Sequence, residues 1–199
     1  SELEPLMACP HSPDNVKKVK DVEKKPVQQV FIGSCTNGSY TDIARAALAF
    51  KGRHVNDNVS CTCGIATRQI YKQLLHDGYL DMLIDAGVRL IEIACGPCCG
   101  IGQTPPTNGV AVRTSNRNFK GRSGSAQLYL VSPETAAATA VAGTFTTAED
   151  IMGAEGVKAL AEIHEPEHYF IDDSMFIKPL PDEKLAKVQI VRGPNIKPL

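Results

Sequence analysis

Tryptophan is absent from this chain of 199 residues, and aromatic side chains make up only 6% of it. A surface that stacks nucleic-acid bases on aromatic rings is therefore not expected. The formal net charge is -1, so the chain has no excess of positive charge that would attract polyanions in general. Both shortages argue against a nucleic acid as a partner.

Long apolar stretches are also absent. No run of about 18 consecutive apolar residues occurs, so we expect no membrane-spanning helix and no membrane partner. Residues 1–5 have neither the basic residues nor the apolar core of a signal peptide. We therefore expect the protein to lie in the cytoplasm, or in the mitochondrial matrix if its source is eukaryotic.

Cysteine is present, but not in the pattern of a secreted disulfide framework. The seven cysteines are an odd number and are unevenly spaced, mostly among apolar residues and glycines. This distribution favours a reducing compartment and roles in metal binding or catalysis.

Apolar runs that favour strands alternate along the chain with segments of helical periodicity. Strands are predicted over residues 27–32, 59–63, 88–93, 109–114 and 127–131, and helices over 40–50, 66–76, 79–85 and 133–142. A further helix over 149–164 is expected to break at Gly153. The alternation predicts an α/β fold, a three-layer α/β/α sandwich on a mostly parallel sheet.

We expect this sandwich to occupy residues 27–165. Residues 1–26 are predicted to form an irregular lead-in, because Pro5, Pro10 and Pro13 interrupt any helix there. Residues 166–199 contain several prolines and are predicted to form a linker, with an edge strand near 187–191.

Loops of small residues that carry cysteine follow two of the predicted strands. Cys35 lies in GSCTNG (33–38), and Cys95 and Cys98 lie in ACGPCCG (94–100). Ligands of parallel sheets bind outside the carboxyl ends of the strands, where such loops meet. Thiolates are soft ligands that suit iron–sulfur clusters or zinc. Three thiolates without an evident fourth ligand suit a [4Fe–4S] cluster in which one iron stays open.

The loop after the predicted strand 109–114 adds polar groups at the same edge of the sheet. Arg117 and Arg122 suit the bidentate binding of a carboxylate, and Asn116 or Asn37 can donate to a cluster or to a substrate. An open iron acts as a Lewis acid on a hydroxyl or a carboxylate. Together these groups suggest the dehydration and rehydration of a hydroxy acid.

Two other interpretations of the cysteines stay open at this point. Cys95-Gly-Pro-Cys98 is also the dithiol motif of thioredoxin-like redox proteins, although there it opens a helix and usually neighbours tryptophan. Structural zinc normally takes four ligands, and the fourth would come from Cys63, Cys99 or a histidine. Packing is the expected role of Cys63 and Cys99 otherwise.

The remaining two cysteines carry no ligand spacing. Cys9 is expected to be a surface thiol, and Cys61 is expected to be a small buried apolar residue.

Four motifs, in this order, resemble the aconitase family, which includes aconitase, homoaconitase and the large subunit of isopropylmalate dehydratase. They are GSCTN (33–37), ACGPC (94–98), SNRNFKGR (115–122) and VSPE (131–134), within a resemblance that runs from about Pro10 to the end of the chain. The resemblance implies that Cys35, Cys95 and Cys98 ligate a [4Fe–4S] cluster. It also implies three active-site residues, Asn116, Arg117 and Arg122, of which both arginines face substrate carboxylates.

The enzymes of this family combine three α/β/α domains with a mobile swivelling domain, which is fused or carried on a separate subunit. The resemblance implies that this chain is the third domain with the start of the linker, and that its partners are the other domains. The implied substrate is a di- or tricarboxylic hydroxy acid, with citrate and isocitrate the expected pair. We expect the chain to be inactive alone, because the acid–base groups of the other domains are missing.

Some aconitase relatives lose the cluster and bind RNA, which the net charge argues against here. The chain also departs from the family pattern at two places. TCGI (62–65) stands where many members have TPGS, and Cys99 stands where Ile, Leu or Met is usual. Neither departure removes an implied cluster ligand.

Overall fold

The computed structural model describes residues 3–195 and centres on one twisted sheet. Its seven strands lie in the order β2 (Val16–Lys18), β1 (Leu6–Ala8), β7 (Gln127–Leu130), β6 (Val110–Arg113), β3 (Gln29–Gly33), β4 (Ser60–Gly64) and β5 (Arg89–Leu90). The five strands from β7 to β5 pair in parallel, whereas β1 pairs antiparallel with β7 and with β2. The predicted α/β class with a mostly parallel sheet is confirmed.

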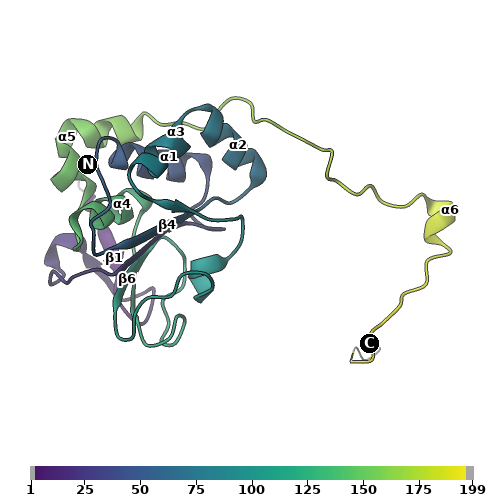
Figure 1. The fold of residues 1–199 in the computed structure, drawn as a ribbon, viewed down its shortest axis with the longest axis horizontal. Coiled ribbons are helices and arrows are strands. Elements are labelled where there is room, and N and C mark those ends of the chain that lie inside the picture. The colour runs from purple at the N-terminus through teal and green to yellow at the C-terminus, as the bar shows by residue number, and fades with distance from the viewer. Residues whose placement is uncertain (1–2, 196–199) are drawn as a thin grey trace.

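Five helices cover one side of this sheet, as Figure 1 shows. They are α1 (Tyr40–Phe50), α2 (Arg68–His76), α3 (Tyr79–Asp85), α4 (Pro133–Ala142) and α5 (Ala148–Ala161). Helix α1 begins at Ser39, whose hydroxyl accepts from the backbone of Asp42 while the Asp42 side chain accepts from the backbone of Ser39. Such a reciprocal cap satisfies two backbone N–H groups that a helix start would leave unpaired.

The core lies between these helices and the sheet. Val30 and Ile32 of β3 and Val112 of β6 point to this side and pack in one buried cluster with Ile43 and Phe50 of α1. Helix α4 is rich in alanine and seven of its ten residues are buried, so its backbone packs closely against α1 and β3. Alternation along a strand sends the next residues to the opposite face of the sheet.

That opposite face is covered by loops and by one short 3-10 helix, η2 (Gly96–Cys99). Its apolar part is a small cluster of Ala111, Ala126 and Leu128. Beside the cluster lie buried polar side chains, among them Gln29 of β3 and Arg113 of β6. The cysteine turn of η2 therefore rests on a polar patch of the sheet.

The expectation of an irregular segment over residues 1–26 was wrong. Strands β1 and β2 form a hairpin that extends the sheet, and a 3-10 helix, η1 (Val19–Asp21), follows it. The prolines exclude a helix but not an edge strand, and Pro5 and Pro10 lie just outside β1. The salt bridges of Glu4 to Lys18 (2.8 Å) and Lys20 (2.5 Å) join the two sides of the hairpin.

Cys9, expected on the surface, is buried, because it follows β1 under this hairpin and its N–H donates to the carbonyl of Asn15.

Two further differences from the predicted elements concern strands. Strand β5 covers only Arg89–Leu90 of the expected 88–93, because the chain leaves the sheet after the Ile91 N–H bonds to Cys63. No strand forms over 187–191, which lies within the described residues.

Helix α5 breaks where the sequence predicts, since Gly153 has φ 72° and ψ 173°.

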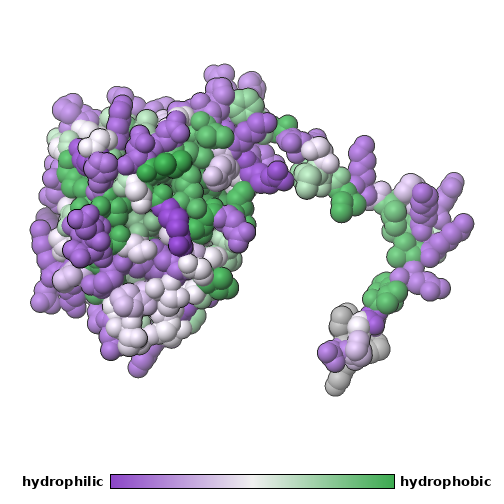
Figure 2. Space-filling model, in the orientation of Figure 1, coloured by the Kyte–Doolittle hydropathy of each residue, from purple (hydrophilic) through white to green (hydrophobic). Residues whose placement is uncertain are grey.

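Beyond residue 165 the chain runs away from the sheet as an extended segment with one helical turn, α6 (Asp182–Leu185) (Figure 1). Apolar side chains stay exposed along it, as the green residues of this segment in Figure 2 show. They include Ile171, Met175, Phe176, Ile177, Ile190 and Val191. Within residues 3–195, no helix is long and apolar enough to cross a membrane.

Candidate functional site

The loop of Cys35 turns sharply at the carboxyl end of β3. Gly33 has φ 96°, and a Cβ atom there would lie 2.0 Å from the carbonyl oxygen of Gly64 on β4. Ser34 follows with φ 72° and donates its N–H to that same carbonyl over 2.6 Å. This close approach of two backbones is possible only without a side chain at residue 33. It leaves the Cys35 thiol exposed at the sheet edge.

Cys95 and Cys98 lie on the turn formed by η2. The N–H of Cys98 donates to the carbonyl of Cys95 over 3.0 Å, and Pro97 lies in the first turn. A domain without its neighbours would be expected to expose all three thiols. The Cys95 thiol is exposed, but only 5% of Cys98 is accessible, because the turn folds back on the sheet beneath Arg122.

The Cys35 loop and the loop after β6 are joined by hydrogen bonds. The hydroxyl of Thr114 accepts from the N–H of Gly33 over 2.7 Å, and the Asn37 side chain donates to the carbonyl of Thr114. Two hydroxyls next to these loops, those of Ser34 and Ser115, are buried and have no partner among the described residues. Buried polar atoms in native proteins are normally paired, so these two hydroxyls are available to a group bound between the loops.

The three predicted active-site residues of the loop after β6 differ in their surroundings. Asn116 and Arg117 are exposed and make no hydrogen bond or ion pair within the described residues. Arg122 instead donates from Nε to the carbonyl of Cys98 over 2.9 Å and from Nη2 to its Sγ over 3.3 Å. The bond to the sulfur and the nearby thiols hold the pKa of Arg122 above its ordinary value. The structure thus brings Arg122 and Cys98 together, as the sequence predicts for one site.

Two residues of this site were missed. Asn118 is buried and its amide donates to the carbonyl of Cys9 over 2.9 Å, so the loop after β6 is anchored to the β1–β2 hairpin. Arg113 is fully buried on β6 and donates to the Cys98 carbonyl over 3.3 Å. Burial lowers the pKa of Arg113 to about 10. A signal for Arg113 was available, since an arginine inside an apolar strand is unusual.

The remaining cysteines have separate places. Cys61 and Cys63 are buried in the core on the helix side of β4, and burial raises the pKa of the Cys63 thiol to about 12. Burial raises the pKa of the Cys61 thiol as well, so both thiols favour the protonated form, as expected of residues that pack in the core. Cys99 is partly buried and donates its thiol to the carbonyl of Gly96 over 3.3 Å.

The donor set suits a soft metal or a cluster, although the thiols do not form a closed site. In residues 3–195, no group of three His, Cys, Asp or Glu side chains lies close enough together to hold a metal ion. The chemistry of the residues fits, because all three thiols are free and one of them is bordered by guanidinium N–H groups. The dithiol interpretation fits less well, since Cys95 opens a 3-10 turn of four residues and not a long helix.

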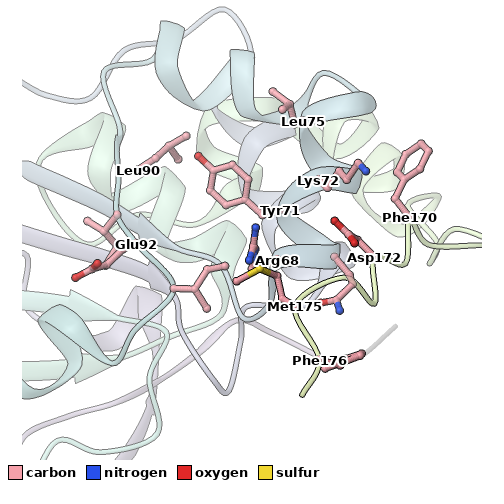
Figure 3. A pocket seen from close by; sticks show the side chains of 13 residues that line it. Arg68, Tyr71, Lys72, Leu75, Leu90, Glu92, Phe170, Asp172, Met175 and Phe176 are labelled. Atoms are coloured by element: carbon pink, nitrogen blue, oxygen red, sulfur yellow. The ribbon is translucent and has the colours of Figure 1, made fainter. Parts of the chain in front are cut away.

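A groove of about 800 Å³ lies beside the cysteine turn, between α2, residues 90–93 and the start of the extended segment. Figure 3 shows Tyr71 of α2 pointing toward Leu90, and Lys72 of the same helix pointing toward Phe170 of the extended segment. Phe170 holds the extended segment on α2 through a cation–π contact with Lys72 at 5.4 Å and a ring contact with His76 at 5.0 Å. None of the predicted site residues lines this groove.

An α/β domain with thiols and arginines at the carboxyl edge of its parallel sheet defines a class of ligand-binding domains. Comparison with known proteins identifies the family within this class. The sequence profile of the aconitase family (aconitate hydratase) matches residues 1–143, so the chain belongs to the aconitase family.

Three similar proteins carry informative names. The probable 3-isopropylmalate dehydratase large subunit of Methanothermobacter thermautotrophicus is 46% identical over 150 residues, which are 73% of this chain and 36% of that protein. The 3-isopropylmalate dehydratase large subunit of Sulfurihydrogenibium sp. is 44% identical over 163 residues, or 80% of this chain and 38% of that protein. The methanogen homoaconitase large subunit of Methanocaldococcus jannaschii is 42% identical over 153 residues, which are 75% of this chain and 36% of that protein. The chain therefore spans little more than a third of the length of these relatives.

Proposed function

We propose that this chain is the cluster-binding domain of an aconitase-type hydro-lyase, in which Cys35, Cys95 and Cys98 hold a [4Fe–4S] cluster. The observation that carries the proposal is the contact of Arg122 with Cys98, because it joins a predicted substrate-binding residue to a predicted cluster ligand. Membership of the aconitase family and the unpaired hydroxyls of Ser34 and Ser115 support it.

The chain's own residues supply binding and orientation. A cluster held by three thiolates leaves one iron free to act as a Lewis acid on a substrate hydroxyl. Arg117, exposed and unpaired within the described residues, is free to bind a substrate carboxylate bidentately. Arg122 keeps N–H groups on Cys98 and is the second carboxylate-binding residue, and Asn116 is free to donate to either the cluster or the substrate. These roles make Asn116, Arg117 and Arg122 the active-site residues of the chain.

The substrate we propose is a di- or tricarboxylic hydroxy acid of the kind that isopropylmalate dehydratases or homoaconitases act on. The names of the similar proteins support this choice, and they give no support to citrate or isocitrate in particular. The family's reaction is the reversible removal of water, so we assign this chain to a lyase.

The partners we propose are the remaining domains of the enzyme, on the same polypeptide or on a second one. "Large subunit" in the names of the relatives supports a smaller partner polypeptide. We further propose that residues 27–165, together with the β1–β2 hairpin that extends their sheet, are the cluster-binding domain and that the segment from 166 onward is a linker. The exposed apolar side chains of that segment, such as Ile177 (98% exposed) and Val191 (93%), suit contact with a partner domain.

The experiment is a spectroscopic titration of the reconstituted 199-residue chain with 2-isopropylmalate and with citrate. After loading with ⁵⁷Fe, Mössbauer spectroscopy distinguishes an open iron from the thiolate-bound ones. We expect 2-isopropylmalate to change the signal of one iron only, and the chain to show no hydratase turnover by itself. If neither acid changes the signal of any iron, the proposed substrate site is overturned. Turnover by the isolated chain would overturn the interpretation that it is a fragment.

A further inference from the structure

Arg113 is a buried guanidinium beneath the cysteine turn. Its side chain is 0% exposed, and it projects from the last residue of β6 onto the face that η2 covers. Nε and Nη2 donate to Oε1 of Gln29 over 3.2 and 2.6 Å. Nη1 donates to the hydroxyl of Ser123 over 2.9 Å and to the carbonyl of Cys98 over 3.3 Å. One side chain therefore links β3, the turn of Cys98 and the loop that carries Arg122.

The same network continues across the sheet. The Gln29 amide donates to the carbonyl of Gln103 over 3.0 Å. The Gln103 side chain in turn donates to the Ser60 hydroxyl over 2.7 Å and accepts from the Thr62 hydroxyl over 2.6 Å. Strand β4 and the segment after η2 are thus tied to the same arginine. A polar network whose members are all paired gives a buried region one fixed arrangement.

The partners of Arg113 are all neutral. In the described part of the chain, no carboxylate forms a salt bridge with it. Burying a charge without a counterion is costly, and proteins normally pair such groups. A fixed positive charge beneath the cysteine turn therefore favours a negatively charged ligand there.

We propose that Arg113 is a positioning residue for the cysteine turn. With Arg122 it holds the carbonyl of Cys98 from two sides and so fixes the direction in which the Cys98 sulfur faces its ligand. That this ligand is an iron–sulfur cluster rests on the proposed function, whereas the clamp on Cys98 is a property of the chain without any ligand.

The test is the alkylation rate of each cysteine in the folded, metal-free 199-residue chain, followed by mass spectrometry of peptides. In Arg113→Met we expect Cys98 to react about tenfold faster or more. The hydrogen bonds of the charged guanidinium to the turn are lost, so the turn opens more often by about the same factor. Cys95 is already exposed and should not change. Cys61 and Cys63, in the core on the other face, should stay protected and report that the fold is intact.

Arg89→Met is the matched control, because exposed Arg89 donates to the carbonyl of Gly102 over 2.8 Å without contacting Cys98. It should leave the Cys98 rate unchanged. Arg113→Lys keeps the charge but not the planar fork, so it too should expose Cys98. If Arg113→Met does not fold, Arg113→Lys and Ser123→Ala must each raise the Cys98 rate with Cys61 protected.

An unchanged Cys98 rate in the folded variants would overturn the proposal. So would a parallel rise at Cys61 and Cys63, since that pattern means general loss of stability. A second readout is the decay of visible absorption after anaerobic loading with iron and sulfide, which should be faster in Arg113→Met than in Arg89→Met. If the wild-type chain takes up no iron, the proposed cluster is contradicted but the role of Arg113 is not, because the alkylation result is obtained without metal.

Discussion

Arg122 contacts Cys98 twice, with Nη2 3.3 Å from the sulfur and Nε 2.9 Å from the backbone oxygen. The sequence assigns one of these residues to substrate and the other to a metal. Their contact means that a change at either residue should be felt at both functions. N–H donors on a ligating sulfur are also among the groups that tune an iron–sulfur cluster.

We predict from this contact that Arg122→Gln loses a reconstituted cluster about tenfold faster than wild type, since two charge-assisted bonds to Cys98 disappear. The decay of visible absorption in air-free buffer with a chelator measures it. Arg117→Gln is the matched control, because exposed Arg117 has no contact with a cysteine. Equal decay in the two variants would show that the Arg122 contact has no effect on the cluster.

Gly33→Ala should destabilise the chain severely, by about 3 kcal/mol, because a strained backbone and a clash combine there. The new Cβ atom would lie 2.0 Å from the Gly64 carbonyl, at a residue with φ 96°. Gly52→Ala has φ 70° in open space and should cost only about 1 kcal/mol. Urea unfolding midpoints measure both changes, and a similar loss in the two variants would refute the steric argument.

Asn118→Ala should destabilise the chain by about 2 kcal/mol, because it leaves the buried carbonyl of Cys9 without its donor. The Cys9 thiol should also become faster to alkylate, since the loop after β6 would separate from the β1–β2 hairpin. Asn116→Ala, at an exposed residue two positions earlier, should leave urea stability within error of wild type. The anchoring role fails if Cys9 remains as protected in Asn118→Ala as in wild type.

Asp77 should make part of the stability depend on pH. Partial burial tends to raise its pKa, but hydrogen bonds from Gln73, His76 and Tyr40 outweigh burial and hold the pKa below its ordinary value. The ionised form is therefore favoured in the folded state. Its contribution is complete above the ordinary pKa of about 3.9 and is lost as the pH falls through the lower folded value.

Asp77→Asn should accordingly be less stable than wild type by about 1 kcal/mol at pH 7, with the difference shrinking toward pH 3. Urea titrations at both pH values measure this change. A difference that is the same at pH 7 and pH 3 would mean that the charge of Asp77 has no part in stability.

Local sequence signals predicted much of the fold. Helices α1, α3 and α4 begin and end where the sequence places them, because Ser39 and Ser132-Pro133 mark starts and Gly143 marks an end. The β1–β2 hairpin was missed because its strands have only three residues each and depend on pairing with each other and with β7. Such long-range pairing leaves little trace in a local pattern.

The candidate site was predictable in its residue types but not in its contacts. The spacing of Cys35, Cys95 and Cys98 after strands indicates a shared edge. The burial of Cys98 could not be predicted, because it depends on the packing of Arg113 and Arg122 around one carbonyl oxygen. Arg113 belongs to none of the four motifs; its place inside an apolar strand is an unusual feature of the sequence, but its contact with Cys98 follows only from the fold.

Iron uptake distinguishes a three-thiolate cluster site from a dithiol site. The 199-residue chain is reconstituted anaerobically with iron and sulfide, and iron, sulfide and visible absorption are measured for wild type, Cys35→Ser and the buried-thiol control Cys61→Ser. We expect close to a full [4Fe–4S] cluster in wild type and in Cys61→Ser, and its loss in Cys35→Ser. Absence of iron from wild type, together with a reversible Cys95–Cys98 disulfide, would contradict the cluster site and favour the dithiol chemistry instead.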